Sequence, residues 1–244
     1  MALGPNNRFG ARTGRMTHSQ AYDASIDMGL RKYMLGVYNY MTLGVAITGL
    51  MAYVVSTQPA IMQTLFGTGL AWVVMLAPLA FVMVLSFGIH KLSASATQLM
   101  FWAFASVMGL SLSTIFIAYT DASIARVFFI TAGAFAGLSL YGYTTKRDLT
   151  GFGSFLVMGL IGLVIAMIVN IFLASSAMDF AISVIGVLIF AGLTAYDTQR
   201  IKSMYYEGDS ADTMTKKSVM GALSLYLDFI NMFMMLLHLF GNRE

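Results

Sequence analysis

The sequence predicts an all-α membrane protein that crosses the bilayer several times. Of its 244 residues, 58% are hydrophobic and only 10% are charged, whereas a soluble domain carries roughly 25% charged residues. Apolar stretches close to the ~20 residues that a helix needs to cross the hydrocarbon recur along the chain. Cysteine is absent, which excludes disulfides, thiolate metal sites and cysteine nucleophiles. We therefore expect that the protein is not an enzyme and that it holds no cofactor and no tightly bound metal.

The first 32 residues differ from the rest of the chain. They are polar, contain five Lys or Arg residues and have no apolar core, so they do not form a cleavable signal peptide. We interpret residues 1–32 as a polar cytoplasmic tail and residues 33–244 as a single transmembrane domain. The net charge of +3 indicates membrane orientation and contact with anionic lipid in such a protein, and not nucleic acid binding.

Seven apolar segments follow the tail, each of a length suited to one transmembrane helix. We place them at Tyr33–Val55, Leu70–Ile89, Leu99–Tyr119, Ser123–Tyr143, Phe152–Leu173, Phe180–Tyr196 and Val219–Phe240.

The distribution of Lys and Arg predicts the orientation of these segments. Twelve of the fourteen fall in the tail and in alternate turns, near Lys91, near Lys146–Arg147 and across Arg200–Lys217. The other side holds only Arg126 and Arg243. Because cytoplasmic loops are enriched in Lys and Arg, we expect a protein of the inner (plasma) membrane with a cytoplasmic N-terminus. The last segment either crosses completely or re-enters the membrane.

The last segment carries an acid that the membrane disfavours. Asp228 lies within the otherwise apolar stretch Leu223–Phe240, on one helix face with Ser224, Asn231 and His238. A single acid at the centre of a span costs about 2.5–3.5 kcal/mol on insertion scales. We therefore expect a partner for Asp228 elsewhere in the chain.

Asp197, at the end of the sixth segment, is the candidate for that partner. In one interpretation it pairs with Arg200, three residues on, and only anchors the end of a helix. In the other it faces inward and meets Asp228, since a short loop joins the two helices. If the last helix starts near Lys217, Asp228 sits about 16 Å along it and deeper than Asp197, unless that helix begins late.

Two neighbouring carboxyls would titrate as a unit, because the repulsion between two adjacent negative charges makes it unfavourable to ionise both. Such a pair is a proton sensor. It also offers weak oxygen ligation to a hard cation such as Ca²⁺, which normally takes six to eight oxygens. Weak binding suits an ion that must leave the site again.

Small residues predict where helices approach each other closely. Gly133 and Gly137 form a GxxxG pattern, and Gly159 and Gly162 lie in the fifth segment. Such positions let helix backbones come close, so we expect them to pack against other helices of the chain.

Three motifs resemble the Bax inhibitor-1 family of membrane proteins. They are LSLYLDFINMF (Leu223–Phe233), AYDTQRIK (Ala195–Lys202) and LSLYGYTTKRDLT (Leu138–Thr150). The resemblance extends from about Arg31 to the C-terminus. It implies seven helices wrapped around a central C-terminal helix, and a pH-dependent calcium leak controlled by a di-aspartyl sensor whose acids match Asp197 and Asp228.

The resemblance also identifies a departure from the family pattern. Bacterial members latch one acid with an arginine at the end of the second span, whereas this chain has His90 and Lys91 there. Lysine offers a point charge and not a bidentate fork. His90, Lys91 and Arg200 are therefore the candidates for the latch or for tuning of the pair.

Other functions fit the same residues. For a calcium leak we expect the lipid bilayer, calcium ions and protons as partners. The alternative is an interaction protein in the same bilayer, which modulates a membrane-bound quality-control protease or the cell-death and stress machinery and has a membrane protein as a further partner. Intramembrane aspartyl proteolysis also uses two acids, but Asp228 lacks the Gly-x-Gly-Asp context and no Pro follows Pro78. Acid pairs serve as proton relays too, so a proton-coupled transporter is a further alternative.

Overall fold

The computed structural model describes residues 18–243, with side chains from Asp27 onward. This range folds into nine helices and contains no strand beyond an isolated bridge between Tyr119 and Arg243. The helices are α1 (His18–Ser56), α2 (Pro59–Phe66), α3 (Leu70–Gly88), α4 (Ala94–Leu112), α5 (Ile115–Ala118), α6 (Asp121–Thr144), α7 (Thr150–Leu173), α8 (Ser176–Ser203) and α9 (Ala211–Phe240).

The prediction of an all-α membrane protein with seven spans is confirmed. Seven segments in the described range are long and apolar enough to cross a membrane, α4 and α5 together forming one of them. Three helices extend by seven residues or more beyond the predicted segments: α1 begins at His18, α8 continues to Ser203, and α9 begins at Ala211. The short α2 lies in a connection for which no helix was predicted.

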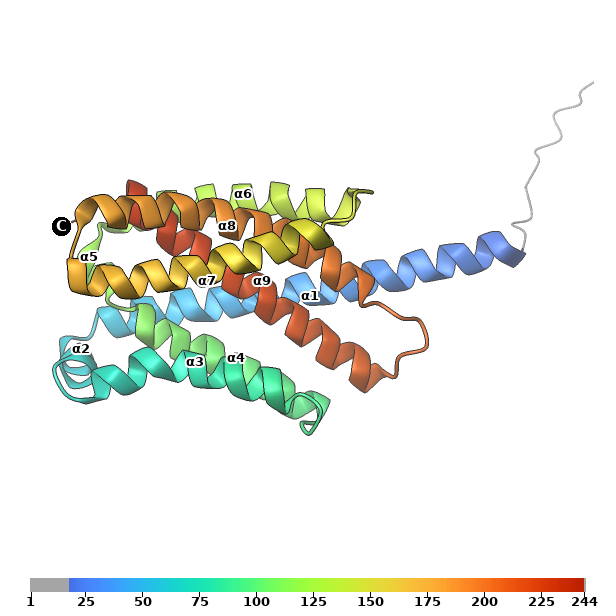
Figure 1. Cartoon of the computed structure of the whole chain (residues 1–244). Coiled ribbons are helices and arrows are strands. Elements are labelled where there is room, and N and C mark those ends of the chain that lie inside the picture. The colour runs from blue at the N-terminus through green and yellow to red at the C-terminus, as the bar shows by residue number, and fades with distance from the viewer. Residues whose placement is uncertain (1–17, 244) are drawn as a thin grey trace, which may run out of the picture.

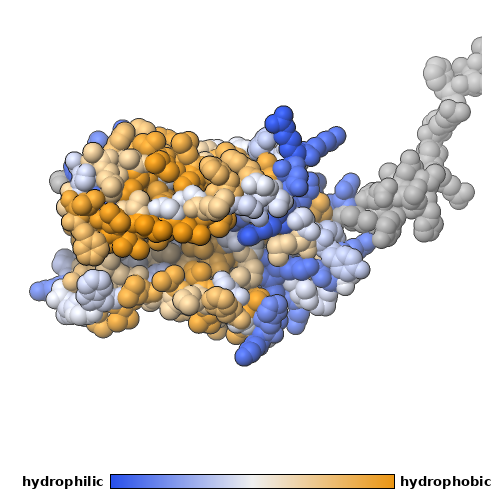
Figure 2. Space-filling model, in the orientation of Figure 1, coloured by the Kyte–Doolittle hydropathy of each residue, from blue (hydrophilic) through white to orange (hydrophobic). Residues whose placement is uncertain are grey.

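The spanning helices run up and down between two ends of the bundle (Figure 1). We call one the charged end; it holds the start of α1 and the turns that follow α3, α6 and α8. The opposite end, which we call the far end, holds the remaining turns and the C-terminus. Hydrophilic residues gather at the charged end and apolar ones cover the length between the ends in Figure 2. This surface fits a chain that crosses a bilayer.

Helix α9 is the centre of the bundle. In the apolar part of α9, 72% of the residues are buried, whereas 17–39% are buried in the corresponding parts of the other spans. It packs against α8, α1, α6 and α4. Fully buried Tyr226 packs edge-on against Phe101 and Phe104 of α4, and its hydroxyl lies 2.6 Å from that of Thr48 on α1. The expected central C-terminal helix is thus present.

The C-terminal end of α9 is bound at the far end of the bundle, opposite the charged end where α9 begins. The Thr120 backbone N–H donates to the Asn242 carbonyl at 3.1 Å, and the Asn242 N–H donates to Ser123 Oγ at 2.9 Å. Arg126 Nη2 donates to the Phe240 carbonyl at 3.5 Å. The helix therefore runs unbroken from the charged end to the far end, which is the course that a complete crossing requires.

Serine side chains fix the start of three helices. Ser93, Ser175 and Ser210 each accept a hydrogen bond from the backbone N–H three residues on, at 3.2–3.3 Å. This satisfies one of the donors that the first turn of a helix leaves unpaired. The cap at Ser210 explains why α9 begins well before its apolar segment.

The glycines that bring helices together are mostly not those that the sequence pattern predicted. A Cβ on Gly109 would overlap Met51 and the Thr48 carbonyl of α1, so α4 depends on this glycine for its approach to α1. Gly142 approaches the backbone of Ala195 in the same manner. A Cβ on Gly133 or Gly137, in contrast, would meet no atom of the described residues within 4 Å. The prediction that the GxxxG pattern packs within the chain is therefore wrong, since this face of α6 is open.

Candidate functional site

Asp197 and Arg200 lie near the end of α8 and form an ion pair. Arg200 Nη2 is 3.3 Å from Asp197 Oδ1, and the spacing of three residues places both on one face of the helix. The Asp197 side chain is only 12% exposed, whereas that of Arg200 is 47% exposed. The guanidinium also lies 5.7 Å from the centre of the Tyr196 ring. One end of the arginine thus reaches solvent while the carboxyl is enclosed.

Helix α9 contributes the second half of the site. Arg200 Nη2 donates to Ser224 Oγ at 3.3 Å, so the guanidinium bridges α8 and α9. Asp228 follows Ser224 by four residues and therefore lies on the same face. It is 5% exposed, and its Oδ2 has no hydrogen-bond partner among the described residues. The Asn231 amide donates to the Leu227 carbonyl of its own helix.

The register between α8 and α9 decides that these residues meet. Lys217 Nζ donates to the Met204 carbonyl at 2.9 Å, which fixes where the two helices begin to run side by side. The first turns of α9, from Ala211, lie apart from the end of α8 (Figure 1). Counting from Lys217 and Met204, Asp228 and Asp197 lie about 16 and 10 Å along their helices. Asp228 therefore lies about one helical turn deeper than Asp197, and both acids still line the same cavity.

Both acids line one cavity of about 480 Å³ between α7, α8 and α9. Its walls on the α7 side are apolar, and its polar groups come from Asp197 and Arg200 on α8 and from Ser224, Asp228 and Asn231 on α9. The two interpretations of Asp197 are therefore compatible, because Asp197 pairs with Arg200 and also lines the same cavity as Asp228.

The arrangement has a clear chemical capacity. Two carboxyls and one guanidinium leave a single negative charge when both acids are ionised. A buried oxygen without a hydrogen-bond partner costs free energy. Binding of one proton or one cation at this site would offset that cost. Among the described residues no cluster of three or more His, Asp or Glu side chains is arranged to hold a metal ion.

The structure brings together three of the five residues that the sequence singled out. Asp197, Asp228 and Arg200 line one cavity, whereas His90 and Lys91 lie exposed in the turn after α3. Helix α3 packs against α4 and α2. Neither His90 nor Lys91 forms an ion pair with any side chain from Asp27 to Arg243. The cation beside the acid pair is thus the arginine of α8 itself.

A chain of hydroxyls behind the acid pair was not predicted. Tyr38 of α1 and Ser139 of α6 share a hydrogen bond of 2.6 Å, and Ser139 lies 2.9 Å from the hydroxyl of Thr198. Thr198 directly follows Asp197 and also donates to the Thr194 carbonyl. Single hydroxyl residues in apolar spans carry no signal in sequence, because their meaning depends on which helices are neighbours.

A second polar cluster ties α9 to α7 and α8 at the far end. Asn170 Nδ2 donates to Asp179 Oδ1 at 2.9 Å, and Asn170 Oδ1 accepts from the Ser175 N–H. His238 Nε2 lies 3.6 Å from Asp179 Oδ2. This agrees with a structural role for Asn170 and His238, since both hold helix ends together.

Comparison with known proteins places the chain in a family. Residues 30–244 match the family described as "Inhibitor of apoptosis-promoting Bax1". The chain is 51% identical to the inner membrane protein YbhL of Escherichia coli K12 over 88% of its own length and 94% of that protein.

Two further relatives extend the similarity over nearly whole chains. A protein of Caulobacter vibrioides is 49% identical over 98% of this chain and 100% of its own. A membrane protein of Streptococcus pyogenes serotype M3 is 33% identical over 89% and 96%. With its seven spans, central C-terminal helix and matched motifs, this multi-pass membrane protein belongs to the Bax inhibitor-1 family.

Proposed function

We propose that the protein is a pH-dependent cation leak, with calcium as the permeant ion, gated by the Asp197–Asp228 pair. The observation that carries the proposal is the bridge in which Arg200 contacts both Asp197 and Ser224. It ties α8 to α9 beside a buried acid that has no partner among the described residues. A proton on the acids would weaken this tie.

The proposed closed state is the one in which Asp197 is ionised. Its charge holds the guanidinium in place, and the guanidinium in turn holds Ser224 of the central helix. Protonation removes the charge and leaves Arg200, whose side chain is about half exposed, free to turn toward solvent. Helices α8 and α9 then separate at the charged end, which in this proposal faces the cytoplasm.

The oxygens around the cavity support a hard cation as the transported ion. Asp197, Asp228, Ser224 and Asn231, whose side chains all carry an oxygen, line it. Calcium takes six to eight oxygens, so water has to complete the shell. Such a site binds weakly, and weak binding is what conduction requires.

Calcium flux into liposomes with an enclosed calcium dye tests the proposal. Wild-type flux should rise as the pH falls from 8 to 5. Asp197→Asn and Asp228→Asn should each lose most of this pH dependence, because the amide cannot titrate. Asp212→Asn is the matched control: Asp212 lies on α9 like Asp228, but it is exposed in the first turn and outside the cavity, so its removal should leave the profile unchanged. Equal flux and equal pH dependence in all four proteins would contradict the proposed role.

A further inference from the structure

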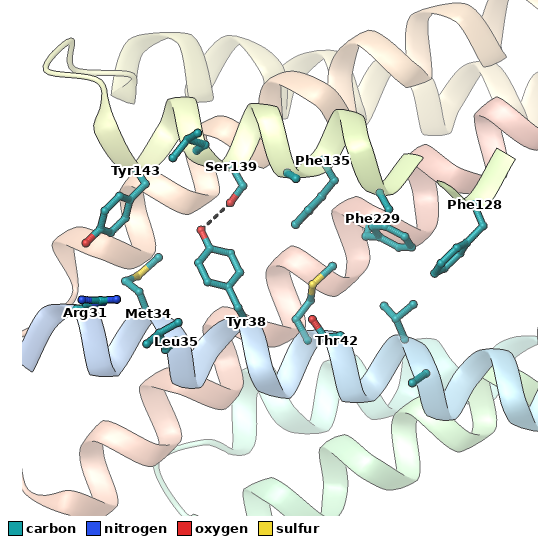
Figure 3. A pocket seen from close by; sticks show the side chains of 16 residues that line it. Arg31, Met34, Leu35, Tyr38, Thr42, Phe128, Phe135, Ser139, Tyr143 and Phe229 are labelled. Carbon is teal, nitrogen blue, oxygen red and sulfur yellow. Dashed lines mark hydrogen bonds between the residues drawn. The ribbon is translucent and has the colours of Figure 1, made fainter. Parts of the chain in front are cut away.

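A deep groove lies between α1 and α6, away from the acid pair. A cavity of about 780 Å³ separates the two helices, within the range of roughly 300–1,000 Å³ typical of ligand pockets. Figure 3 shows side chains of both helices pointing into this space, with Phe229 of α9 behind it. Helix α1 packs against α4 and α9, and α6 against α8 and α9, so α9 forms the floor of the groove.

The groove continues toward the far end. A second cavity of about 410 Å³ shares Val45, Phe128 and Phe229 with the first and extends to Tyr53 of α1. From Arg31 to Tyr53 the helix rises by about 33 Å, close to the ~30 Å thickness of the hydrocarbon core. The first cavity alone, from Arg31 to Val45, covers about 21 Å. This is ample for one acyl chain, which occupies one leaflet.

The walls of the groove are apolar and partly made of small residues. Ala132 and Ala136 of α6 line the first cavity, next to the Gly133 and Gly137 positions that face open space. No water is available at this depth to fill an apolar channel favourably, and lipid tails are as apolar as the walls. The occupant of the groove is therefore apolar along most of its length.

The charged end of the groove has the opposite character. Arg31 lies exposed at its mouth, opposite Tyr143 of α6 (Figure 3). Lys202 lies next to Tyr143: its ammonium is 4.9 Å from the ring centre and donates to the Tyr143 carbonyl at 2.8 Å. Arg31 forms no ion pair with any of the described side chains. Two cations beside an apolar channel match an anionic headgroup attached to a hydrocarbon chain.

One contact limits the width of the occupant. The hydrogen bond between Tyr38 and Ser139 crosses from α1 to α6 within the first cavity (Figure 3). A helix with its side chains is about 10–12 Å in diameter and cannot lie between two helices that are joined in this way. A single acyl chain can pass along the bridge without breaking it.

We propose that this groove binds an anionic phospholipid from the leaflet at the charged end. Its phosphate lies at Arg31 and one acyl chain runs between α1 and α6 past Ala136. The lipid site does not depend on the proposed cation leak, since the two sites share no lining residue.

Native mass spectrometry of the full chain, released from nanodiscs of palmitoyl-oleoyl phosphatidylglycerol and phosphatidylcholine in equal parts, tests the site. Wild type should retain one phosphatidylglycerol several-fold more often than phosphatidylcholine. Arg31→Gln should remove this preference, whereas Lys32→Gln, an equal charge change outside the groove, should keep it. Ala136→Trp should abolish retention of either lipid by filling the groove, whereas Ala134→Trp, on the same helix but outside the groove, should not.

Two results would overturn the proposal. One is equal lipid retention by Ala136→Trp and Ala134→Trp. The other is a groove covered by a second copy of the chain. Because the chain has no cysteine, Leu140→Cys provides a unique thiol beside the groove. Efficient formation of disulfide-linked dimers in the same nanodiscs, without bound lipid, would show that a second copy occupies the groove.

Discussion

At the scale of single residues, Arg200 connects two helices that otherwise meet through apolar contacts at this level. It reaches the nearest acid on its own helix and a serine on the next one. Asp197, Asp228 and Arg200 could be predicted from the sequence, because charged groups are conspicuous in apolar spans and a spacing of three places two of them on one helix face. The part played by Ser224 depends on the register between helices, which no local pattern encodes.

Arg200→Gln should open the proposed latch without unfolding the protein. An ion pair with one partner about half exposed contributes about 1 kcal/mol or less, which shifts a two-state ratio about fivefold. We expect about that increase in calcium flux at pH 7, with little change in the thermal midpoint. Arg200→Lys is the control for charge, since a lysine can neutralise Asp197 but cannot contact Ser224 at the same time. An unchanged flux in Arg200→Gln would argue against the latch.

Asp148 allows a test of whether acids outside the membrane contribute to the pH response. Hydrogen bonds from the Thr150 side chain and backbone hold the pKa of this exposed carboxyl below its usual 3.8. A depressed pKa means that any stability gained is present above about pH 4 and lost only as the pH falls further. Asp148 therefore stays ionised from pH 8 to 5, and Asp148→Asn should leave the pH midpoint of flux unchanged. A shifted midpoint would assign part of the sensing to this turn.

At the scale of helices, length and hydrophobicity predicted the spans, but not their contacts. All seven spans were expected, whereas α2 is too short and the extensions of α1 and α9 too polar to stand out. The GxxxG pattern of α6 predicted a contact that the described residues do not make. The pattern indicates that another helix can come close, but it does not identify that helix. Gly109 and Gly142, which do permit close approach, belong to no such motif.

Gly109→Ala should destabilise the protein, whereas Gly133→Ala should not. A Cβ at Gly109 would lie 2.6 Å from Met51 Cβ and 2.7 Å from the Thr48 carbonyl oxygen, and overpacking of this kind costs about 1–3 kcal/mol. At Gly133 the added methyl meets open space, and alanine gains up to about 1 kcal/mol in helix propensity. Thermal unfolding in detergent compares the two variants; equal midpoints would contradict the packing of α1 on α4.

At the scale of the whole molecule, charge separates the two ends of the bundle. The N-terminal start of α1 and the basic turns lie together at one end, and Arg126 and Arg243 lie at the other, as their positions in the sequence predicted. The lateral groove between α1 and α6 could not be predicted. It results from how α9 separates two helices that are distant in sequence.

Single-cysteine variants should report the orientation, since the natural chain has no thiol. Glu207 is exposed in the loop before α9, and Thr68 is exposed at the far end between α2 and α3. We choose these two positions for the substitutions Glu207→Cys and Thr68→Cys. Because Lys and Arg are enriched on the cytoplasmic side, a membrane-impermeant maleimide added to intact cells should label Thr68→Cys and spare Glu207→Cys. The reverse pattern would place the charged end outside.

We propose that α8 and α9 separate beside the acid pair when the channel opens. Gly221 and Ile201 lie across this contact, where a Cβ on Gly221 would be 2.9–3.4 Å from the side-chain carbons of Ile201. This proximity suits a disulfide, whose Cβ atoms lie about 3.5–4.5 Å apart. In liposomes containing Ile201→Cys/Gly221→Cys, oxidation should abolish calcium flux at acid pH, and reduction of the same sample should restore it. Full acid-activated flux through the oxidised protein would contradict it.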